Sequence, residues 1–264
     1  MRIPYFQVSA FTSSPFGGNP AGVCPLERWL SDAAMQRIAS ENNLSETAFF
    51  THEKEHFHLR WFTPATEVDL CGHATLAAAF VLFTELGCRE QSVQFQTLSG
   101  PLSASRRGDL IELDFPSRPA AACATPQNLL QGLGLQPAEV LKSRDYLAVF
   151  QTPAEVAALQ PDMNLLSQLD CLGVIATSRD DKADFVSRFF APRAGVPEDP
   201  VTGSAHSTLI PYWAARLGKS DLFARQISKR GGELYCRNAG DRVGIGGRAA
   251  IYCRGELELE DVGG

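Results

Sequence analysis

The chain has 264 residues, a formal net charge of −6 and a hydrophobic content of 44%. This length suits two hydrophobic cores, and the balance of apolar and charged residues excludes a disordered chain. The negative charge, without any basic cluster, argues against nucleic acid as a partner. The longest apolar run, 74–83, is too short to span a bilayer, so we expect no membrane partner either.

Seven cysteines are spread along the chain without a CxxC pair. An odd number of scattered cysteines is typical of reduced thiols and predicts a cytoplasmic protein. The N-terminal stretch MRIPYFQVSAFTSS alternates like a strand and has no basic segment followed by an apolar block, so we expect no signal peptide.

In chain order, alternation predicts a first strand at 3–11, followed by a glycine- and proline-rich loop at 14–23. Ser31 is a candidate N-cap for a helix that runs to about Asn42. Strands are then predicted at 46–50 and 56–62, joined by a turn at 52–55.

A helix from Gly72 to about Leu86 follows, and it is apolar nearly all round. Such a helix must be enclosed by other elements rather than laid on a surface. Gly87 suits the residue just past its end.

Further strands are predicted at 92–97, 101–106 and 110–115. The Pro/Ala-rich segment 116–126 is the candidate boundary between two lobes, 1–120 and 121–264, of which the last strand can return to the first lobe. The remaining predicted elements are short helices at 127–133, 137–142, 153–159 and 163–169, strands at 171–178 and 184–190, a long helix at 204–217 that contains Pro211, and strands at 232–238, 242–247 and 248–259.

One unit occurs twice. RWFTPATEVDLCGHATL begins at Arg60 and RFFAPRAGVPEDPVTGSAHSTL begins at Arg188, each an aromatic strand, an acidic loop and a Gly-polar-Ala helix start. Such duplication predicts two similar lobes, each with a strand-rich wrap around a buried helix.

Each helix start offers unpaired backbone N–H groups and a partial positive charge. Glycine at Gly72 and Gly203 would let a ligand approach the backbone closely. We therefore expect the Gly-His and Gly-Ser corners to face one cleft and to hold a small carboxylate. In the alternative reading, the two glycines only make tight turns into helices.

The segments AFTSSPFGGNPAGV, NNLSETAFF, RWFTPATEVDLCGHATLAAAFVL and RFFAPRAGVPEDPVTGSAHSTLIPYWAARLG resemble the phenazine-biosynthesis PhzF-like isomerase family. The resemblance covers most of the chain. It implies an α+β protein with a diaminopimelate-epimerase-like fold, in which two similar lobes each wrap a strongly curved, mostly antiparallel, barrel-like sheet around a central buried helix. It also implies a homodimer that moves a proton between carbons of a small amino acid-like carboxylate, with neither cofactor nor metal.

The resemblance assigns roles to particular residues. Glu46 of the SETAF motif becomes the general acid/base, joined by two further catalytic residues, His73 and Asp199. The expected substrate-binding residues are Gly72, Gly203, Ser204 and Asn19, the last interpreted as a turn residue that lines the cleft. The N-terminal strand carries Ser9 where the family often has Asp, at a supporting position.

Proton transfer between two carbons is most efficient when the pKa of the acid/base lies near working pH. A free glutamate titrates at about 4.3, and raising its pKa to about 7 requires roughly 4 kcal/mol of destabilisation of the anion. We expect enclosure near Phe49 and Phe50 to supply that for Glu46.

Three alternatives stay open. A racemase or epimerase of the same fold would need two thiols, but the repeat aligns Cys71 with Thr202. A zinc hydrolase would use His52–His56, HEKEH, but that motif works on a helix and here lies between two predicted strands. A non-catalytic member would bind a small acid or a protein without turnover.

Overall fold

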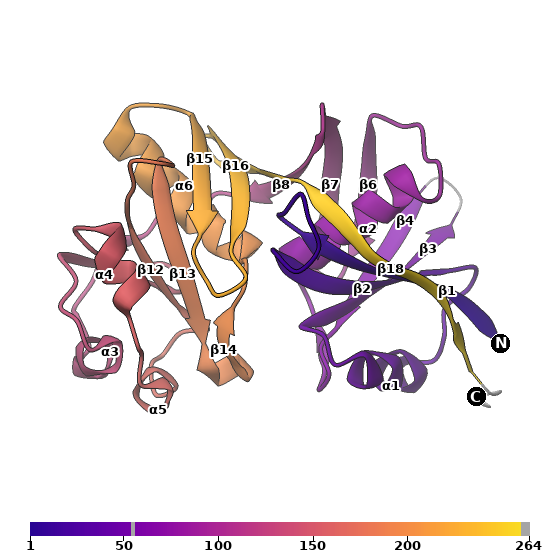
Figure 1. Cartoon of the computed structure of the whole chain (residues 1–264), viewed down its shortest axis with the longest axis horizontal. Helices are drawn as coiled ribbons and strands as arrows, with labels where there is room; N and C mark the ends of the chain where they lie inside the picture. Colours follow the sequence, from indigo (N-terminus) through magenta and orange to yellow (C-terminus); the bar gives the residue numbers. More distant parts are fainter. Residues whose placement is uncertain (54–55, 260–264) are drawn as a thin grey trace. The chain divides into compact units, whose positions relative to one another are not determined.

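The structure, a computed structural model of the chain, describes residues 1–53 and 56–259. Its contacts divide the chain into two compact units, and Figure 1 colours them along the sequence. One unit contains Met1–Asp114 together with the chain from Gly246 onward, and the other contains Phe115–Ile245. Each unit is described by itself.

The first unit is a mixed sheet wrapped around one helix. Its elements are β1 (Arg2–Ala10), β2 (Asn19–Leu26), α1 (Asp32–Asn42), β3 (Glu46–Glu53), β4 (His56–Phe62), β5 (Glu67–Val68), α2 (Gly72–Thr84), β6 (Ser92–Thr97), β7 (Gly100–Arg107), β8 (Leu110–Pro116) and β18 (Ala249–Glu258). β1 pairs antiparallel with β2 and β18, β2 parallel with β3, and β3 antiparallel with β4. β4 then runs parallel to β6, which is followed by antiparallel β7 and β8.

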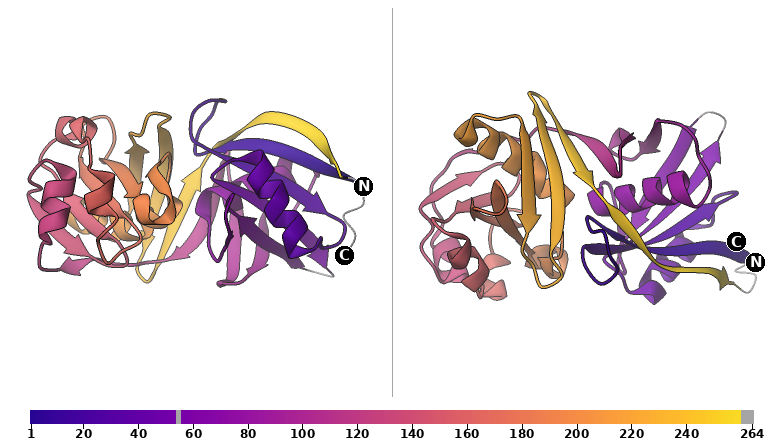
Figure 2. Two further views of the ribbon diagram at one scale, coloured as in Figure 1. Left: turned by 90° about the horizontal axis from the view of Figure 1, so that it is seen from below. Right: turned by 45° about the horizontal axis from the view of Figure 1, so that its top comes forward.

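α2 lies inside this sheet (Figure 2) and contacts β1, β2, β3, β7 and β18. All of its residues from Gly72 to Thr84 are buried except Phe80 and Thr84. The prediction of an enclosed apolar helix is therefore confirmed, because strands from several parts of the unit cover it.

α1 begins where its cap predicted. The Ser31 Oγ accepts a hydrogen bond of 3.3 Å from the Ala34 N–H, and Asn43 ends the helix with a left-handed φ of 47°. The buried face of α1 carries Met35, Ile38 and Ala39, which pack in one core cluster with β3 and β4.

The predicted loop at 14–23 is wrong in its second half, because Asn19 begins β2. Asn19 pairs with Ala10 of β1 and is fully buried, so it is not a turn residue. β2 has β1 on one side and β3 on the other, and these partners override the local glycine and proline signal. The predicted turn at 52–55 falls partly on Lys54 and Glu55, which lie outside the described residues.

The second unit also combines a sheet with one long helix. Its elements are β9 (Ala121–Ala122), α3 (Gln127–Leu133), β10 (Glu139–Lys142), β11 (Tyr146–Val149), α4 (Pro153–Ala158), α5 (Met163–Leu166), β12 (Val174–Arg179), β13 (Phe185–Ala191), η1 (Pro192–Ala194), β14 (Val196–Asp199), α6 (Gly203–Leu217), β15 (Asp221–Gln226), β16 (Gly232–Ala239) and β17 (Arg242–Gly247). α6 contacts β15 and β16, whereas α4 contacts β12 and β13 (Figure 1).

Three local predictions in this unit are wrong. The helix predicted at 137–142 is strand β10, which pairs antiparallel with β11. The acidic loop after Arg193 contains the short strand β14, and β15 has no counterpart among the predicted strands. In each case pairing with a neighbouring strand decides the conformation. Within the described residues, no helix is long and apolar enough to cross a membrane.

The internal repeat is visible in matched ion pairs. In the first unit Arg60 binds both oxygens of Glu67, at 2.7 Å each, and its guanidinium lies 5.1 Å from the Phe62 ring centroid. In the second unit Arg188 binds both oxygens of Glu198, at 2.7 and 3.0 Å, and its guanidinium lies 4.9 Å from the Phe190 ring centroid. Each pair ties the aromatic strand to the acidic segment before the buried helix.

Gly247 packs closely against Phe11 and against Leu76 of α2. A Cβ on Gly247 would lie 2.4 Å from a ring carbon of Phe11 and 3.3 Å from the Leu76 Cδ1. We expect Gly247→Ala to lower the free energy of unfolding by about 1–3 kcal/mol, because the buried Phe11 ring has no room to move. Urea denaturation measures this loss.

The matched control is Gly255→Ala in β18, where a Cβ would meet nothing within 4 Å. Its free energy of unfolding should change by less than about 0.5 kcal/mol. Equal denaturation midpoints for the two variants would contradict the packing argument.

Candidate active site

Three elements of the first unit bring polar side chains together at the start of α2. Asn19 is the first residue of β2, Glu46 is the first residue of β3, and His73 is the second residue of α2. β2 and β3 run parallel, and Ala21 pairs with Glu46, so both strands begin near one another. The fold therefore places these side chains at one end of the buried helix.

The side chains are in direct contact. The His73 Nε2 lies 3.0 Å from the Glu46 Oε2, and the Asn19 Nδ2 lies 3.1 Å from the His73 Nδ1. Asn19 is fully buried and His73 is 5% exposed, while the Glu46 side chain keeps 18% of its surface exposed. The Glu46 side chain is thus the most exposed member of this contact, although its Oε2 is buried against His73.

The charges of Glu46 and His73 support each other. Burial alone would raise the pKa of Glu46, but the His73 charge and hydrogen bond outweigh burial and hold that pKa below its ordinary value. Burial alone would lower the pKa of His73, yet its neighbours Cys71 and Glu46 raise that pKa well above the ordinary value. The expected rise of the Glu46 pKa to about 7 is therefore wrong for this structure, because an imidazolium partner counts for more than the apolar surroundings.

Asn19 controls the orientation of the imidazole. An amide offers either an N–H donor or, after a half-turn, a carbonyl acceptor. Asn19 can therefore satisfy the His73 Nδ1 in either protonation state, and the His73 Nε2 keeps its proton directed at Glu46. This contact makes Asn19 a partner of His73 in addition to its predicted role toward substrate.

Cys71 completes the cluster. Its Sγ lies 3.5 Å from the His73 Nδ1. Burial, reinforced by the Glu46 charge, raises the pKa of the thiol to about 11, so the thiol is neutral near pH 7. A neutral buried thiol is a poor base and a poor metal ligand.

The arrangement of Glu46, Cys71 and His73 also bears on whether these residues could bind a metal ion. Among the described residues, Glu46, Cys71 and His73 place one donor atom each within 4.8 Å of one another. The 3.0 Å contact between two of these donors is a hydrogen bond, and metal binding would require the thiolate that burial disfavours. The HEKEH segment also lacks the helical geometry of a zinc motif, because His52 and Glu53 lie in β3 and His56 lies in β4.

The second unit holds a matching corner at the start of α6. Asp199 ends β14, Thr202 is the N-cap residue, and Gly203 and Ser204 open the helix. The Thr202 hydroxyl donates to the Asp199 Oδ2 over 2.5 Å instead of capping the helix. The first N–H groups of α6 therefore have no side-chain cap, as a ligand-binding helix start requires.

The two corners share a further detail. The carbonyl of Cys71 accepts a hydrogen bond of 2.5 Å from the Thr75 hydroxyl, one turn into α2. The carbonyl of Thr202 lies 2.8 Å from the Nδ1 of His206, one turn into α6. In both helices a side chain one turn into the helix thus contacts the carbonyl of the residue that precedes the helix, although the two side chains, Thr75 and His206, differ.

The predicted residues therefore form two groups. Glu46, His73 and Asn19 are in contact in the first unit, with Gly72 beside His73 at the start of α2. Asp199, Gly203 and Ser204 lie along six residues of the second unit. Sequence reasoning missed Gln226, whose buried amide binds the segment before α6, because nothing in the chain predicted the strand that carries it.

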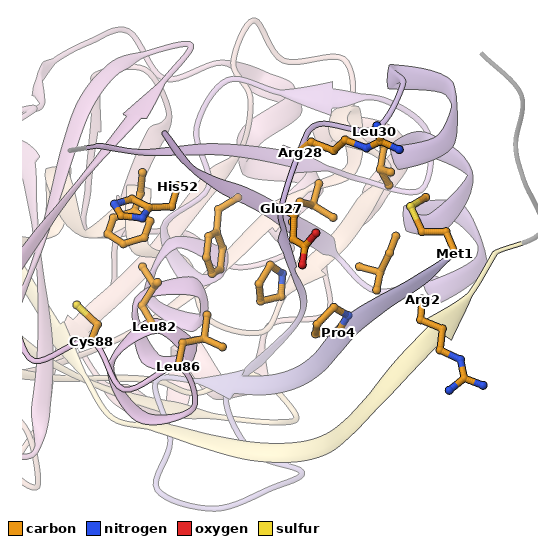
Figure 3. A pocket seen from close by; sticks show the side chains of 15 residues that line it. Met1, Arg2, Pro4, Glu27, Arg28, Leu30, His52, Leu82, Leu86 and Cys88 are labelled. Carbon is orange, nitrogen blue, oxygen red and sulfur yellow. The ribbon is translucent and has the colours of Figure 1, made fainter. Parts of the chain in front are cut away.

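A cavity of about 840 Å³ lies elsewhere in the first unit. Leu82, Leu86 and Cys88, at or just beyond the far end of α2, line it together with His52 and Pro4 (Figure 3). It contains no residue of the Glu46 cluster, since β2, β3 and α2 all run from that cluster toward this cavity.

Comparison with known proteins identifies the family of the chain. The family model described as "PhzC-PhzF: Phenazine biosynthesis-like protein" matches residues 8–255. The chain is 54% identical over 259 residues to an uncharacterized isomerase of Pseudomonas aeruginosa, covering 98% of this chain and 100% of that protein.

Solved structures extend the comparison to the fold. A phenazine biosynthesis protein of the PhzF family from Enterococcus faecalis superposes with a TM-score of 0.96 and 46% identity, over 98% of this chain and 100% of that chain. A hydroxyproline epimerase from Agrobacterium vitis has a TM-score of 0.63 at 13% identity, covering 99% and 94%, which reflects a shared fold. The predicted two-lobed α+β fold of the diaminopimelate-epimerase type is confirmed, and the chain belongs to the PhzF family of phenazine biosynthesis-like proteins.

Proposed function

We propose that this protein is an isomerase that moves a proton between two carbons of a small, carboxylate-bearing, amino acid-like substrate, with Glu46 as general acid/base. The observation that carries the proposal is the contact of 3.0 Å between the Glu46 carboxylate, on a partly exposed side chain, and the buried His73 imidazole. Relatives named as isomerases support the reaction class.

The charge state of the pair suits the first step. At neutral pH Glu46 is a carboxylate, because its pKa is below the ordinary value, and it can accept a proton from a substrate carbon. The C–H bond breaks, the electron pair stays on the substrate, and the proton moves to the Glu46 carboxyl group. The Glu46–His73 pair then carries a net positive charge, which stabilises the carbanion it faces.

The second step returns the proton. The neutral Glu46 carboxyl donates it to a different carbon of the same substrate, so atoms and charges balance and no other reactant is consumed. Because His73 and Glu46 interact strongly, they titrate as one coupled system. The His73 charge lowers the Glu46 pKa, so the protonated carboxyl is a stronger acid and returns its proton to the substrate more readily.

The remaining predicted residues bind the substrate in this proposal. Asp199 and His73 hydrogen-bond its polar groups, while the N–H groups at Gly72, Gly203 and Ser204 hold its carboxylate. Both helix starts lack a carboxylate side chain of their own in the first turn, so a substrate carboxylate meets no competing charge there.

We also propose, on the family resemblance, a homodimer that needs neither cofactor nor metal. Composition supports a cytoplasmic protein that binds neither nucleic acid nor membrane. The seven free cysteines agree with a reducing compartment. Sedimentation velocity tests the dimer, and turnover after dialysis against a chelator tests independence of metal.

Replacing the acid/base tests the proposal directly. Glu46→Gln keeps the size of the side chain and removes its ability to take a proton. We expect solvent deuterium incorporation into a dihydro-hydroxyanthranilate, the type substrate of the family, to fall at least about 100-fold. Glu53→Gln, the same substitution at the exposed end of the same strand, should keep the wild-type rate. Equal incorporation in the two variants would remove Glu46 from the mechanism.

The coupling between Glu46 and His73 predicts a pH dependence that needs no substrate. In the wild type the Glu46 carboxyl should titrate below 4.5, because the His73 charge holds its pKa down. In His73→Gln burial, the largest single cause, is opposed only by the hydrogen bond with Cys71, so the Glu46 pKa should rise. Carbon-13 chemical shifts of the carboxyl group measure both titrations, and an unchanged Glu46 pKa in the variant would contradict the pairing.

A racemase that uses Cys71 as a base is the second candidate, because the thiol lies 3.5 Å from the His73 Nδ1. Its high pKa argues against it, so we expect Cys71→Ser to keep deuterium exchange within about tenfold of the wild-type rate. Loss of activity as deep as that of Glu46→Gln would restore the thiol mechanism.

A further inference from the structure

Gln226 is a buried amide with no assigned role. It ends β15, it is 1% exposed, and β15 is held on one side by β13 and on the other by β16. A side chain of this kind is costly to bury unless every polar atom is used. Its bonding partners therefore indicate its purpose.

All of the side-chain partners lie between Asp199, the last residue of β14, and Thr202, the residue before α6. The Gln226 Oε1 accepts a hydrogen bond of 2.9 Å from the Thr202 N–H. The Gln226 Nε2 donates to the Asp199 carbonyl over 2.8 Å and to the Thr202 Oγ1 over 3.1 Å. One planar amide thus holds both ends of the turn that leads from Asp199 into the helix.

The contact with the Thr202 hydroxyl has a directional consequence. A hydroxyl has one proton, and its oxygen here already accepts from Gln226. The proton is therefore free to point at the Asp199 Oδ2, which lies 2.5 Å away. Gln226 in this way sets the direction of a hydrogen-bond chain, which we call the relay: the Gln226 amide donates to the Thr202 hydroxyl, and that hydroxyl donates to the Asp199 carboxylate.

A neighbouring bond supports the same segment. The Ser228 Oγ donates to the Pro200 carbonyl over 2.7 Å, two residues beyond Gln226. The strand β14 itself pairs with β13 through an irregular register between Phe189 and Ala191, so ladder bonds alone fix the segment poorly. Side chains from β15 and the turn after it supply what the ladder lacks.

We propose that Gln226 is a positioning residue for the active site, which sets the direction of the Asp199 carboxylate and the start of α6. This inference rests on the proposed function, since Asp199, Gly203 and Ser204 bind substrate there. Gln226 itself touches no substrate and acts through Thr202.

Gln226→Met tests the positioning without any substrate. Methionine keeps the length and flexibility of the side chain and removes all of its hydrogen bonds to the segment. Hydrogen–deuterium exchange at 201–204 should become at least about tenfold faster, because the Thr202 N–H loses a buried acceptor. Exchange in the second half of α6, at 210–215, should stay at the wild-type rate.

The matched control is Thr177→Val. Thr177 is fully buried in the same unit, donates to the Val186 carbonyl and accepts from the Trp213 indole N–H. Its loss should lower the melting temperature without changing exchange at 201–204. If exchange at 201–204 is equally slow in wild type, Gln226→Met and Thr177→Val, the proposal is overturned.

The link to function is measured separately, as kcat/KM for the dihydro-hydroxyanthranilate. We expect Gln226→Met to lower kcat/KM about tenfold or more and Thr177→Val to leave it unchanged. If the wild type does not turn over this compound, the substrate assignment of the proposed function fails while the exchange result still decides the role of Gln226.

Two further variants keep the test decisive should Gln226→Met fail to fold. Thr202→Val keeps both backbone bonds to Gln226 and cuts the relay, so exchange of the backbone N–H at position 202 should stay slow while kcat/KM falls. Gln226→Glu keeps an acceptor for the Thr202 N–H but draws the hydroxyl proton away from Asp199, and should give the same result. Wild-type kcat/KM in both variants would show that Asp199 needs no positioning by this route.

Discussion

The contact between Glu46 and His73 is the constraint on which the rest of the site depends. A carboxylate that is largely removed from water would ordinarily take up a proton, and an imidazole that is almost fully buried would ordinarily lose one. Side by side they stabilise each other's charged form. The result is a carboxylate that is ionised at neutral pH and an imidazolium that is held against it.

The fold keeps this pair in place from several directions. Glu46 is fixed by the parallel pairing of β3 with β2, His73 by the enclosed first turn of α2, and the imidazole ring by Asn19 at the start of β2. No loop carries any of the three side chains. A site built on the first residues of strands and a helix is held more precisely than one built on loops.

The internal repeat explains why the starts of α2 and α6 are supported by matching contacts, although their polar side chains differ. In both units an arginine binds a glutamate through both carboxylate oxygens, and in both the carbonyl of the cap residue accepts from a side chain one turn into the helix. The helix start of the first unit carries the Glu46–His73 pair, whereas that of the second unit carries an aspartate that accepts a hydrogen bond from a threonine hydroxyl. The two units thus repeat the same supporting contacts, while the polar side chains at their helix starts differ.

Sequence alone determined the repeated unit, the two buried helices and most of the strands, because apolar periodicity, capping residues and glycine positions act over a few neighbouring residues. It also singled out Glu46, His73 and Asp199, whose catalytic roles stay a prediction. Only the tertiary structure decided that Asn19 lies in a strand, that the Glu46 pKa is lowered rather than raised, and that Gln226 holds the segment before α6. Each of these depends on a strand pairing, a charge or a hydrogen bond between residues far apart in the chain, and such contacts exist only once the backbone has closed around them.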